Sequence, residues 1–403
     1  MKVLQINSVC GIGSTGRIAT DIHNMLVEQG HESYIAYGRD VPKYCHNTIK
    51  IGNIYGTYKH VALTRIFDKH GFGSRKATQD FIKEIEEFAP DIIHLHNIHG
   101  YYMNIKLLFD YLKRVNKPII WTLHDCWTFT GHCAYFDYVK CDKWKKQCFE
   151  CPQKKSYPSS ILMDDSKRNF LKKKEIFTGI NNLTIVTPSD WLARLVKESF
   201  LKEYPVKVIN NGIDLEAFKP TKSDFRKKHN IIDKFIILGV ANIWDDRKGY
   251  RFFIDLLSYI NQDEAIVLVG LTQEQKKRLP RNILGITRTN SVEELAEIYS
   301  MADVFVNPTL EDNFPTTNLE AIACGTPVIT FNTGGSIESV DSCCGTIVEK
   351  KNVKDLYSAI QLYKNDRPTK ENIIAKSRRY DKNERYVEYL DYYYSILTGG
   401  RSE

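Results

Sequence analysis

Short apolar runs rich in valine and isoleucine alternate along the chain with longer segments in which apolar residues recur at helical spacing. Runs that are apolar throughout are typical of parallel strands buried on both faces of a sheet. The first series comprises Val3–Asn7, Ser33–Tyr37, Ile92–His96, Ile119–Leu123, Leu183–Thr187 and Val206–Ile209. The second comprises Phe235–Val240, Ala265–Gly270, Ile283–Thr287, Val304–Asn307, Pro327–Phe331 and Thr346–Val348. Two such series predict two doubly wound α/β domains, which bind ligands beyond the carboxyl ends of their strands.

A turn signal separates the two series. Asn210-Asn211-Gly212 favours a turn, and Pro220 interrupts any helix that follows. We therefore expect the domain boundary near Val208–Pro220. Between Arg378 and Leu397, aromatic residues and leucines at helical spacing predict a final amphipathic helix.

The composition, with 42% hydrophobic and 26% charged residues over 403 positions, is that of a soluble globular protein. No apolar run reaches the 18 or so residues of a transmembrane helix, and the first residues lack the apolar core of a signal peptide. We expect a cytoplasmic protein. In that compartment the ten cysteines are more often free or metal-bound than paired.

The positive charge is concentrated in one segment. Eleven basic residues against four acidic ones lie between Lys140 and Lys174, which equals the whole net charge of +7. One interpretation is a solvated surface. The other is an anchor for the anionic head groups of a membrane surface or for a pyrophosphate-bearing acceptor. No base-stacking module or recognition helix points to nucleic acid.

Residues 309–335 combine two carboxylates with a loop and a pair of glycines, in the stretch "TLEDNFPTTNLEAIACGTPVITFNTGG". Because Pro315 disfavours helix for the residue before it, a loop is expected up to this proline, and a helix is expected to start around Asn318. The N–H groups of Thr316, Thr317 and Asn318 would then lie at a helix N-terminus. Such N–H groups suit a phosphate or a diphosphate.

Glu320, in this predicted helix, has two interpretations. Thr317-x-x-Glu320 is a capping box, in which the glutamate bonds back to the N–H group of the capping residue. The alternative is a ligand contact, because Asp312 and Gly334-Gly335 each follow a predicted strand and should meet at the same sheet edge. A bound nucleoside diphosphate sugar would then place its ribose near one acid and its hexose near the other.

Further motifs carry a family resemblance. They are "TLHDCW" (Thr122–Trp127), "TPSDWLA" (Thr187–Ala193), "NNGIDLEAF" (Asn210–Phe218) and "DRKG" (Asp246–Gly249). With the two acids they resemble the retaining glycosyltransferases of family 4, and the resemblance covers nearly the whole chain. It implies the GT-B fold, in which two Rossmann-like domains face each other. An acceptor-side domain would span residues 1–205, a nucleotide-sugar-binding domain residues 206–380, and a C-terminal helix over 381–403 would pack back on the first domain.

The resemblance also implies roles for single residues. Glu320 would bind the donor ribose, Asp312 would hold hydroxyls of the transferred sugar, and Lys248 would contact the donor diphosphate. The family commonly has glutamate where Asp312 stands, so either the shorter side chain suffices or Glu311 takes its place. An arginine often precedes the lysine by six residues, where this chain has Asn242.

Neutralising the leaving diphosphate would therefore fall to several groups. The expected donor-binding residues are Gly13, Gly16, Arg17, Arg247, Lys248, Pro315, Thr316, Thr317, Asn318 and Glu320. The expected catalytic residues are His124, Asp312 and Lys248. Gly13 and Gly16 belong to a glycine-rich turn, "CGIGSTGR", in which Ser14 or Thr15 could cap the helix that follows. As a dinucleotide fingerprint this turn is weak, and the resemblance assigns it to the donor phosphates.

Histidines accompany two of the predicted strands. His94 and His96 share one strand face, and His99 lies beyond that strand's end. They could form a metal triad, but a polar pocket that meets the acceptor is the interpretation we prefer. His124 ends the next strand and matches the family's active-site histidine near the reacting sugar. Its alternative is a hydrogen-bonded strand-end histidine.

A cysteine cluster lies between residues 126 and 151. Its Cys148-x2-Cys151 end has the spacing of a zinc knuckle, and Cys133 and Cys141 complete four thiolates. We predict a structural zinc in this insertion; the alternative is a set of buried thiols. The cysteine-bearing insertion looks like that of the colanic-acid-type subgroup, which builds bacterial surface polysaccharides.

These observations lead to one functional prediction. The chain is expected to be a retaining, metal-independent glycosyltransferase that moves a hexose from a UDP- or GDP-sugar to a saccharide acceptor, which we expect to be undecaprenyl-linked. Peripheral contact with the inner face of the cytoplasmic membrane would fit such an acceptor. A nucleotide-sugar epimerase of the same GT-B architecture, and a non-catalytic protein that binds sugar nucleotides, are the alternatives.

Overall fold

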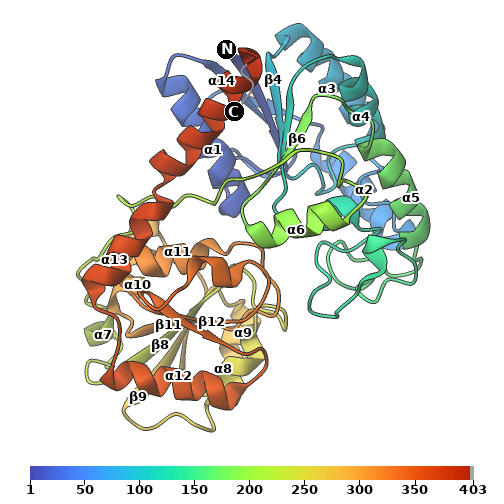
Figure 1. The fold of residues 1–403 in the computed structure, drawn as a ribbon. Coiled ribbons are helices and arrows are strands. Elements are labelled where there is room, and N and C mark those ends of the chain that lie inside the picture. The colour runs from blue at the N-terminus through green and yellow to red at the C-terminus, as the bar shows by residue number, and fades with distance from the viewer. Residues whose placement is uncertain (400–403) are drawn as a thin grey trace. The chain divides into compact units, whose positions relative to one another are not determined.

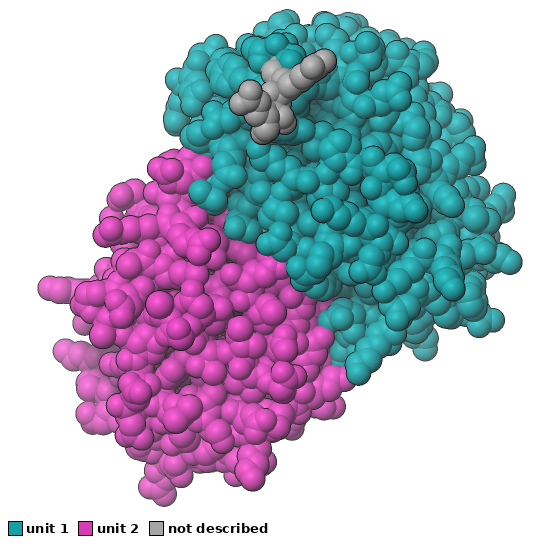
Figure 2. Space-filling model, viewed as in Figure 1, with its two compact units in different colours: residues 1–210, 385–403 teal, residues 211–384 magenta. Residues whose placement is uncertain are grey.

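The structure, a computed structural model, describes residues 1–399, and the chain divides into two compact units. Unit 1 comprises residues 1–210 and 385–403, and unit 2 comprises residues 211–384 (Figure 2). Unit 1 is therefore made from both ends of the chain. Among the described residues, no helix has the length and apolar character needed to cross a membrane.

Unit 1 is built on a seven-stranded parallel sheet with the strand order β3-β2-β1-β4-β5-β6-β7. Its strands are β1 Lys2–Asn7, β2 Glu32–Tyr37, β3 Thr48–Lys50, β4 Ile92–Leu95, β5 Ile119–Thr122, β6 Leu183–Thr187 and β7 Val206–Val208. Its helices are α1 Gly13–Glu28, α2 Ile54–Phe67, α3 Arg75–Phe88, α4 Ile105–Arg114, α5 Ser166–Phe177 and α6 Asp190–Glu198, with short 3-10 turns at Trp127–Phe129 and Lys143–Lys145. Figure 1 shows helices on both sides of this sheet.

The last helix, α14 Lys382–Leu397, completes the core of unit 1. Tyr386, Tyr389, Leu390 and Tyr393 lie in one cluster with Val3 and other residues of β1, α1, β5 and β6. Each of these four side chains is at most 2% exposed. In Figure 1 this red helix lies beside the blue N-terminal strand and helix. The two ends of the chain thus share one apolar layer.

Unit 2 is built on a six-stranded parallel sheet with the order β10-β9-β8-β11-β12-β13. Its strands are β8 Phe235–Val240, β9 Glu264–Val269, β10 Ile283–Ile286, β11 Val304–Asn307, β12 Val328–Phe331 and β13 Gly345–Val348. Its helices are α7 Phe225–Lys228, α8 Tyr250–Leu256, α9 Gln273–Lys277, α10 Val292–Met301, α11 Thr316–Ala323, α12 Val353–Asn365 and α13 Lys370–Ser377, with 3-10 turns η3 Ser336–Ser339 and η4 Arg378–Tyr380.

The prediction of two doubly wound parallel sheets is confirmed. The expected strands agree with the observed ones to within about a residue at each end, and β3 is an additional, partly exposed edge strand. The final helix begins later than its pattern indicated, at Lys382. Asp381, just before it, pairs with Ile213 in an isolated parallel bridge, which ends the preceding 3-10 turn.

Candidate active site

Helix α11 starts directly after Pro315, two residues earlier than a capping box would require. Pro315 is the capping residue and offers no side-chain hydrogen bond, while Thr317 already lies in the first turn. The capping-box interpretation of Glu320 is therefore wrong. A proline fixes its own φ and lacks an N–H group, both of which suit the entry to a helix.

Glu320 lies inside unit 2 with its side chain directed at α10. It is 2% exposed. The hydroxyl of Tyr299 donates a hydrogen bond of 2.9 Å to Glu320 Oε2. A buried carboxylate needs such donors because its desolvation is costly. Tyr299 was not singled out from the sequence, since nothing in its spacing links it to α11.

Asn318, predicted as a donor-binding residue, ties together the elements around the site. Its amide nitrogen donates to the carbonyl of Ser336 (3.1 Å) and to Ser339 Oγ (3.1 Å), and its oxygen accepts from Asn307 Nδ2 (2.8 Å). Its backbone N–H donates to the carbonyl of Pro315. With the side chain fully buried and the N–H so engaged, Asn318 positions the helix, and the predicted anion contact rests on the amides of Thr316 and Thr317.

Asp312 and Lys248 form an ion pair. Lys248 Nζ lies 2.5 Å from Asp312 Oδ2, and Asp312 Oδ1 accepts a hydrogen bond from the N–H of Asn313. The carboxylate is largely buried and the lysine is half-buried. A lysine ammonium has three N–H donors, so the contact with Asp312 engages one of them.

The glycine pair meets Asp312 as predicted from the sheet edge. The N–H of Gly335 donates to the carbonyl of Asp312 at 3.1 Å. Gly334 has a φ of +52°, and a Cβ placed there would lie 2.0 Å from the same oxygen. Only glycine allows this close approach of two loops.

The loop that carries Lys248 is held against the same segment. The carbonyl of Arg247 accepts a hydrogen bond from the N–H of Leu310 at 2.7 Å, and its guanidinium donates to the carbonyl of Glu311 at 3.3 Å. Glu311 is buried, and Asp312 is the acid that pairs with Lys248. These contacts bring Arg247, Lys248 and Asp312 together in unit 2.

The glycine-rich turn of unit 1 differs from its predicted form at the helix cap. Helix α1 begins at Gly13, and its capping residue is Ile12, which makes no side-chain cap hydrogen bond. The prediction that Ser14 or Thr15 caps the helix is therefore wrong, because both lie in the first turn. Gly13 has a φ of +64° and marks a turn that other residues rarely adopt. For Gly13, Gly16 and Arg17, donor binding stays a prediction.

The histidines of β4 share a buried layer but do not form a metal triad. The rings of His94 and His96 lie 4.0 Å apart, and the hydroxyl of Tyr393 is 2.7 Å from His94 Nδ1. His99 contacts Asp125 instead, with Nε2 and Oδ2 3.0 Å apart. In residues 1–399, no group of three or more histidine, cysteine, aspartate or glutamate side chains is placed to hold a metal ion.

A chain of hydrogen bonds fixes the tautomer of His124. Gln5 Nε2 donates to the carbonyl of Ala19 at 3.0 Å, so Gln5 Oε1 faces His96 Nε2, also at 3.0 Å. Because that oxygen can only accept, His96 carries its proton on Nε2 and accepts with Nδ1. His96 Nδ1 is 3.2 Å from His124 Nε2. His124 therefore donates from Nε2, and its Nδ1 carries the lone pair.

Burial keeps these rings neutral. It lowers the pKa of His94 to about 3 and the pKa of His124 to about 4, the latter against the opposing charge of Asp125. Burial also holds the pKa of His96 well below its usual range. At neutral pH the Gln5–His96–His124 chain consists of neutral groups, which is the condition for the assigned tautomers.

The predicted zinc site is not supported. Cys133, Cys141, Cys148 and Cys151 border one small cavity with His132, but no metal-holding group forms in the described part of the chain. Burial raises the pKa of Cys148 to about 12, whereas zinc binds thiolates. Its sulfur accepts a hydrogen bond from the N–H of Gly131, and the free thiols of Cys133 and Cys151 form a hydrogen bond with each other. All four cysteines are free thiols; Cys133 and Cys148 are buried, and Cys141 and Cys151 are partly exposed.

Lys173 belongs to the basic segment between Lys140 and Lys174, but its side chain is buried. Its side chain is 1% exposed and lies 3.4 Å from the ring centroid of Trp127. It donates hydrogen bonds to the carbonyls of Trp127 and Thr130. Burial lowers the pKa of Lys173 to about 7. This lysine supports the cysteine-bearing insertion from inside.

Comparisons with known proteins place the chain in a family. Residues 15–217 match the family described as Glycosyltransferase Family 4, and residues 234–366 match the one described as Glycosyl transferases group 1. The "Putative colanic acid biosynthesis glycosyl transferase WcaC" of Escherichia coli K12 is 25% identical over 378 residues, which cover 88% of this chain and 89% of that protein. The UDP-Gal:alpha-D-GlcNAc-diphosphoundecaprenol alpha-1,3-galactosyltransferase of Escherichia coli is 26% identical over 203 residues, 46% of this chain and 51% of that protein.

Solved structures share the fold over the whole length. HepE of Anabaena, in complex with UDP and glucose, superposes with a TM-score of 0.70 at 16% identity, covering 98% of this chain and 100% of that one. Sucrose-phosphate synthase of Thermosynechococcus elongatus gives a TM-score of 0.73 at 18% identity, covering 99% and 100%. These likenesses confirm the expected GT-B fold. Because the first family match spans half of the chain, the protein belongs to glycosyltransferase family 4 and is a glycosyltransferase that uses a nucleotide-sugar donor.

Proposed function

We propose that this enzyme transfers a hexose, with retention of configuration, from a nucleoside diphosphate sugar to a hydroxyl of a lipid-linked saccharide in surface polysaccharide biosynthesis. The observation that carries the proposal is the pairing of Lys248 with Asp312 on the loops beyond the carboxyl ends of the strands of unit 2. This edge of a doubly wound sheet is where ligands bind.

Lys248 links the two halves of the donor. One N–H of its ammonium is engaged by Asp312, and the other two can donate to the diphosphate. Lys248 would thus stabilise the leaving diphosphate and also orient Asp312, the acid that holds the sugar hydroxyls. Arg247 and the amides of Thr316 and Thr317, which follow Pro315 at the start of α11, would supply the remaining positive potential. This arrangement needs no metal ion.

Glu320 and His124 complete the proposed roles. Glu320, oriented by Tyr299, would accept hydrogen bonds from the donor ribose. His124, whose ring is held by His96 at 3.2 Å, would contact a substrate hydroxyl near the reacting carbon. Gly13, Gly16 and Arg17 would approach the donor phosphates. Front-face attack, with the leaving phosphate accepting the proton, follows from the family resemblance.

The names of relatives support a lipid-linked acceptor. One is an N,N'-diacetylbacillosaminyl-diphospho-undecaprenol alpha-1,3-N-acetylgalactosaminyltransferase of Campylobacter jejuni, 28% identical over 218 residues. Another is a capsular polysaccharide biosynthesis glycosyltransferase, CapM, of Staphylococcus aureus, 26% identical over 206 residues. Each matches about half of this chain. We extend the acceptor class named for the Campylobacter jejuni enzyme, a saccharide on undecaprenyl diphosphate, to this enzyme and expect it to work at the inner face of the cytoplasmic membrane.

A two-step assay tests the proposal. Thermal unfolding is first measured with UDP, GDP, ADP and their common sugars, since a ligand at 100 times its dissociation constant adds about 2.7 kcal/mol. The stabilising donor is then incubated with undecaprenyl-diphosphate-linked mono- and disaccharides, and the products are identified by mass spectrometry. Sugar transfer with release of the nucleoside diphosphate supports the proposal. Conversion of the donor sugar without any acceptor would identify an epimerase, and donor binding without turnover on any acceptor would identify a binding protein.

A further inference from the structure

Helix α2 has its polar and apolar sides reversed. Its buried residues are His60 and Thr64. Its large exposed apolar residues, between 37% and 76% exposed, are Ile54, Tyr55, Tyr58, Leu63, Ile66 and Phe67. A helix on the surface of a soluble domain normally faces the core with its apolar side. The outward face of α2 therefore calls for a covering surface.

The inward side of α2 is anchored by hydrogen bonds. His60 Nε2 accepts from the N–H groups of Gly71 (3.1 Å) and Gly73 (3.3 Å), and His60 Nδ1 is 2.9 Å from Ser74 Oγ. Thr64 donates to the carbonyl of His60. Because these contacts set the rotation of the helix about its axis, the apolar face is held outward.

A second apolar segment extends this face. Ile161, Leu162 and Met163 are 65%, 66% and 50% exposed. The N–H of Ile161 donates to the carbonyl of Arg65 at 2.7 Å, and the N–H of Met163 donates to the carbonyl of Ile66 at 3.2 Å. The segment thus lies directly beside the end of α2. We call the exposed apolar side chains of α2 and of residues 161–163 the α2 patch.

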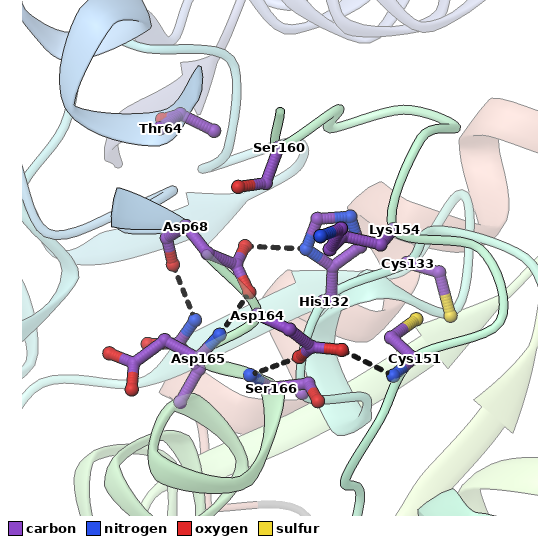
Figure 3. Close-up of polar contacts among 12 residues, drawn as sticks. Thr64, Asp68, His132, Cys133, Cys151, Lys154, Ser160, Asp164, Asp165 and Ser166 are labelled. Carbon is purple, nitrogen blue, oxygen red and sulfur yellow. Dashed lines mark hydrogen bonds and ion pairs between the residues drawn. The ribbon is translucent and has the colours of Figure 1, made fainter. Parts of the chain in front are cut away.

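Polar contacts hold the second segment in place (Figure 3). Asp68, just after α2, binds His132 with Oδ1 and Nδ1 2.5 Å apart and accepts from the N–H of Asp165 at 2.9 Å. Asp164 accepts from the N–H groups of Cys151 (2.6 Å) and Ser166 (2.9 Å). The chain that directly follows the apolar segment is therefore fixed by these hydrogen bonds.

Positive charge accompanies the α2 patch. Helix α2 contains no acidic residue, and its two exposed cations are Lys59 and Arg65. Lys155, Lys167 and Arg168 are exposed on either side of the second segment, where Asp164 is the exposed acid. A face that joins exposed tyrosines and aliphatic side chains to cations complements a bilayer with anionic head groups.

We propose that the α2 patch is the surface by which this enzyme docks on an anionic lipid membrane. The apolar side chains would enter the head-group boundary, the two tyrosines would lie at its polar level, and the cations would contact lipid phosphates. Docking of this kind would bring the enzyme to the membrane that holds the lipid-linked acceptor of the proposed function. It rests on the surface itself, so it can hold or fail separately from the transfer reaction.

The test is co-sedimentation of the full chain with vesicles. Vesicles of phosphatidylcholine alone are compared with vesicles that contain 30% phosphatidylglycerol, at low and at physiological salt. We expect the wild type to bind the anionic vesicles at least tenfold more tightly. The double variant Ile66→Glu/Leu162→Glu and the double variant Lys59→Glu/Arg65→Glu should each lower this binding at least tenfold, since each cation contributes about fivefold. Leu362→Glu, at an exposed apolar position of unit 2, is the matched control and should bind like the wild type.

Other results would overturn the proposal. The proposal fails if the wild type does not bind the anionic vesicles. It also fails if the α2 patch variants and the Leu362→Glu control lower vesicle binding by the same factor. A wild-type dimer in light scattering that the Ile66→Glu/Leu162→Glu variant converts to a monomer, without vesicle binding, would assign the α2 patch to self-association. Sugar transfer to a short water-soluble acceptor, measured without vesicles, should be the same in all variants. Vesicle binding by a chain that shows no transfer would leave the α2 patch standing and refute the proposed function.

Discussion

The two units place different chemistry beyond similar parallel sheets. All eleven histidines except His229 lie in unit 1, where His94 and His96 bond to a buried hydroxyl and to His124, respectively. The candidate donor site of unit 2 is made of carboxylates, a lysine, an asparagine and backbone amides. Burial has lowered the pKa of several unit 1 rings into the range between 3 and 4. We therefore expect mild acid to change the stability of unit 1, and we expect an anionic ligand to change the stability of unit 2.

The largest effect is expected at Lys248. Lys248→Ala should lower kcat/KM about 10²- to 10³-fold, because it removes the donor that the proposed function assigns to the leaving diphosphate. Steady-state kinetics measure this. Arg251→Ala, which removes an exposed cation paired with Asp255, is the control and should be near wild type. If Arg17→Ala lowers kcat/KM more than Lys248→Ala does, unit 1 supplies the positive charge for the leaving group. The proposed difference between the units would then be wrong.

Mild acid should unfold unit 1 before unit 2. Burial lowers the pKa of His60 to about 4 and that of His94 to about 3, so the unfolded state binds more protons below pH 6.5. The stability they contribute is complete above pH 6.5 and is lost as pH falls toward 4, by up to about 3 kcal/mol for each fully buried ring. In unit 2, Asp214 and Asp341 have a lowered pKa through their lysine partners, which outweigh burial, and lose stability only below pH 4.

Hydrogen exchange resolved by mass spectrometry at pH 7, 5.5 and 4.5 would measure both units at once. His132 of unit 1 acts in the opposite sense. Burial lowers its pKa, but the carboxylate of Asp68 outweighs burial, so the pKa of His132 is raised. The stability that His132 contributes is therefore lost as pH rises through its raised pKa. Four of the five tryptophans lie in unit 1, so fluorescence gives an independent signal that excludes most of unit 2. Simultaneous loss of protection in both units at pH 5 would contradict the comparison.

A smaller effect is expected at Glu320. Glu320→Gln should weaken donor affinity by about tenfold or more while the fold survives, because the amide oxygen can still accept from Tyr299 but no longer carries charge. Isothermal titration with the stabilising nucleoside diphosphate measures the affinity. Tyr299→Phe, which keeps the charge and removes one donor, should cost less. Loss of thermal stability without loss of affinity would reduce Glu320 to a structural residue.

The smallest effect should come from Gln5, whose side chain is fully buried. Gln5→Glu would raise the pKa of His96, and a protonated His96 would donate to His124 and move the proton of His124 to Nδ1. We expect kcat to fall about three- to tenfold at pH 7 and to recover as pH rises. Gln5→Met is the control, with a loss that does not depend on pH. Equal losses for both variants at every pH would reduce Gln5 to a packing residue.

The sheets could be predicted because buried parallel strands leave a local signal. Leu183–Thr187, Phe235–Val240 and Val304–Asn307 have the bounds that their apolar runs indicated. Strand β3 was missed because its three residues are partly exposed and carry no such run. The meeting of Asp312 with Gly334-Gly335 was predictable, since both follow strands that end at the same sheet edge.

Contacts between elements could not be predicted from one sequence. The Gln5–His96–His124 chain joins residues more than a hundred positions apart, and Tyr299 meets Glu320 from a different helix. Cysteine spacing suggested zinc, but spacing does not reveal how side chains are placed, and among residues 1–399 these cysteines form no group that could hold a metal ion. No pattern in the sequence distinguishes α2, and only the structure shows that its large apolar side chains point outward.

The arrangement of α14 has a consequence for the synthesis of the protein. Tyr393 and Tyr389 of this helix close over His94 and Thr122 at the centre of unit 1. The ribosome makes residues 385–403 only after it has made all of unit 2, residues 211–384. At about 5–20 residues per second, the open interior of unit 1 must wait on the order of ten to forty seconds for its last helix. During synthesis, unit 2 is therefore complete before unit 1. A prematurely terminated chain without α14 would expose the histidine layer of unit 1 to water.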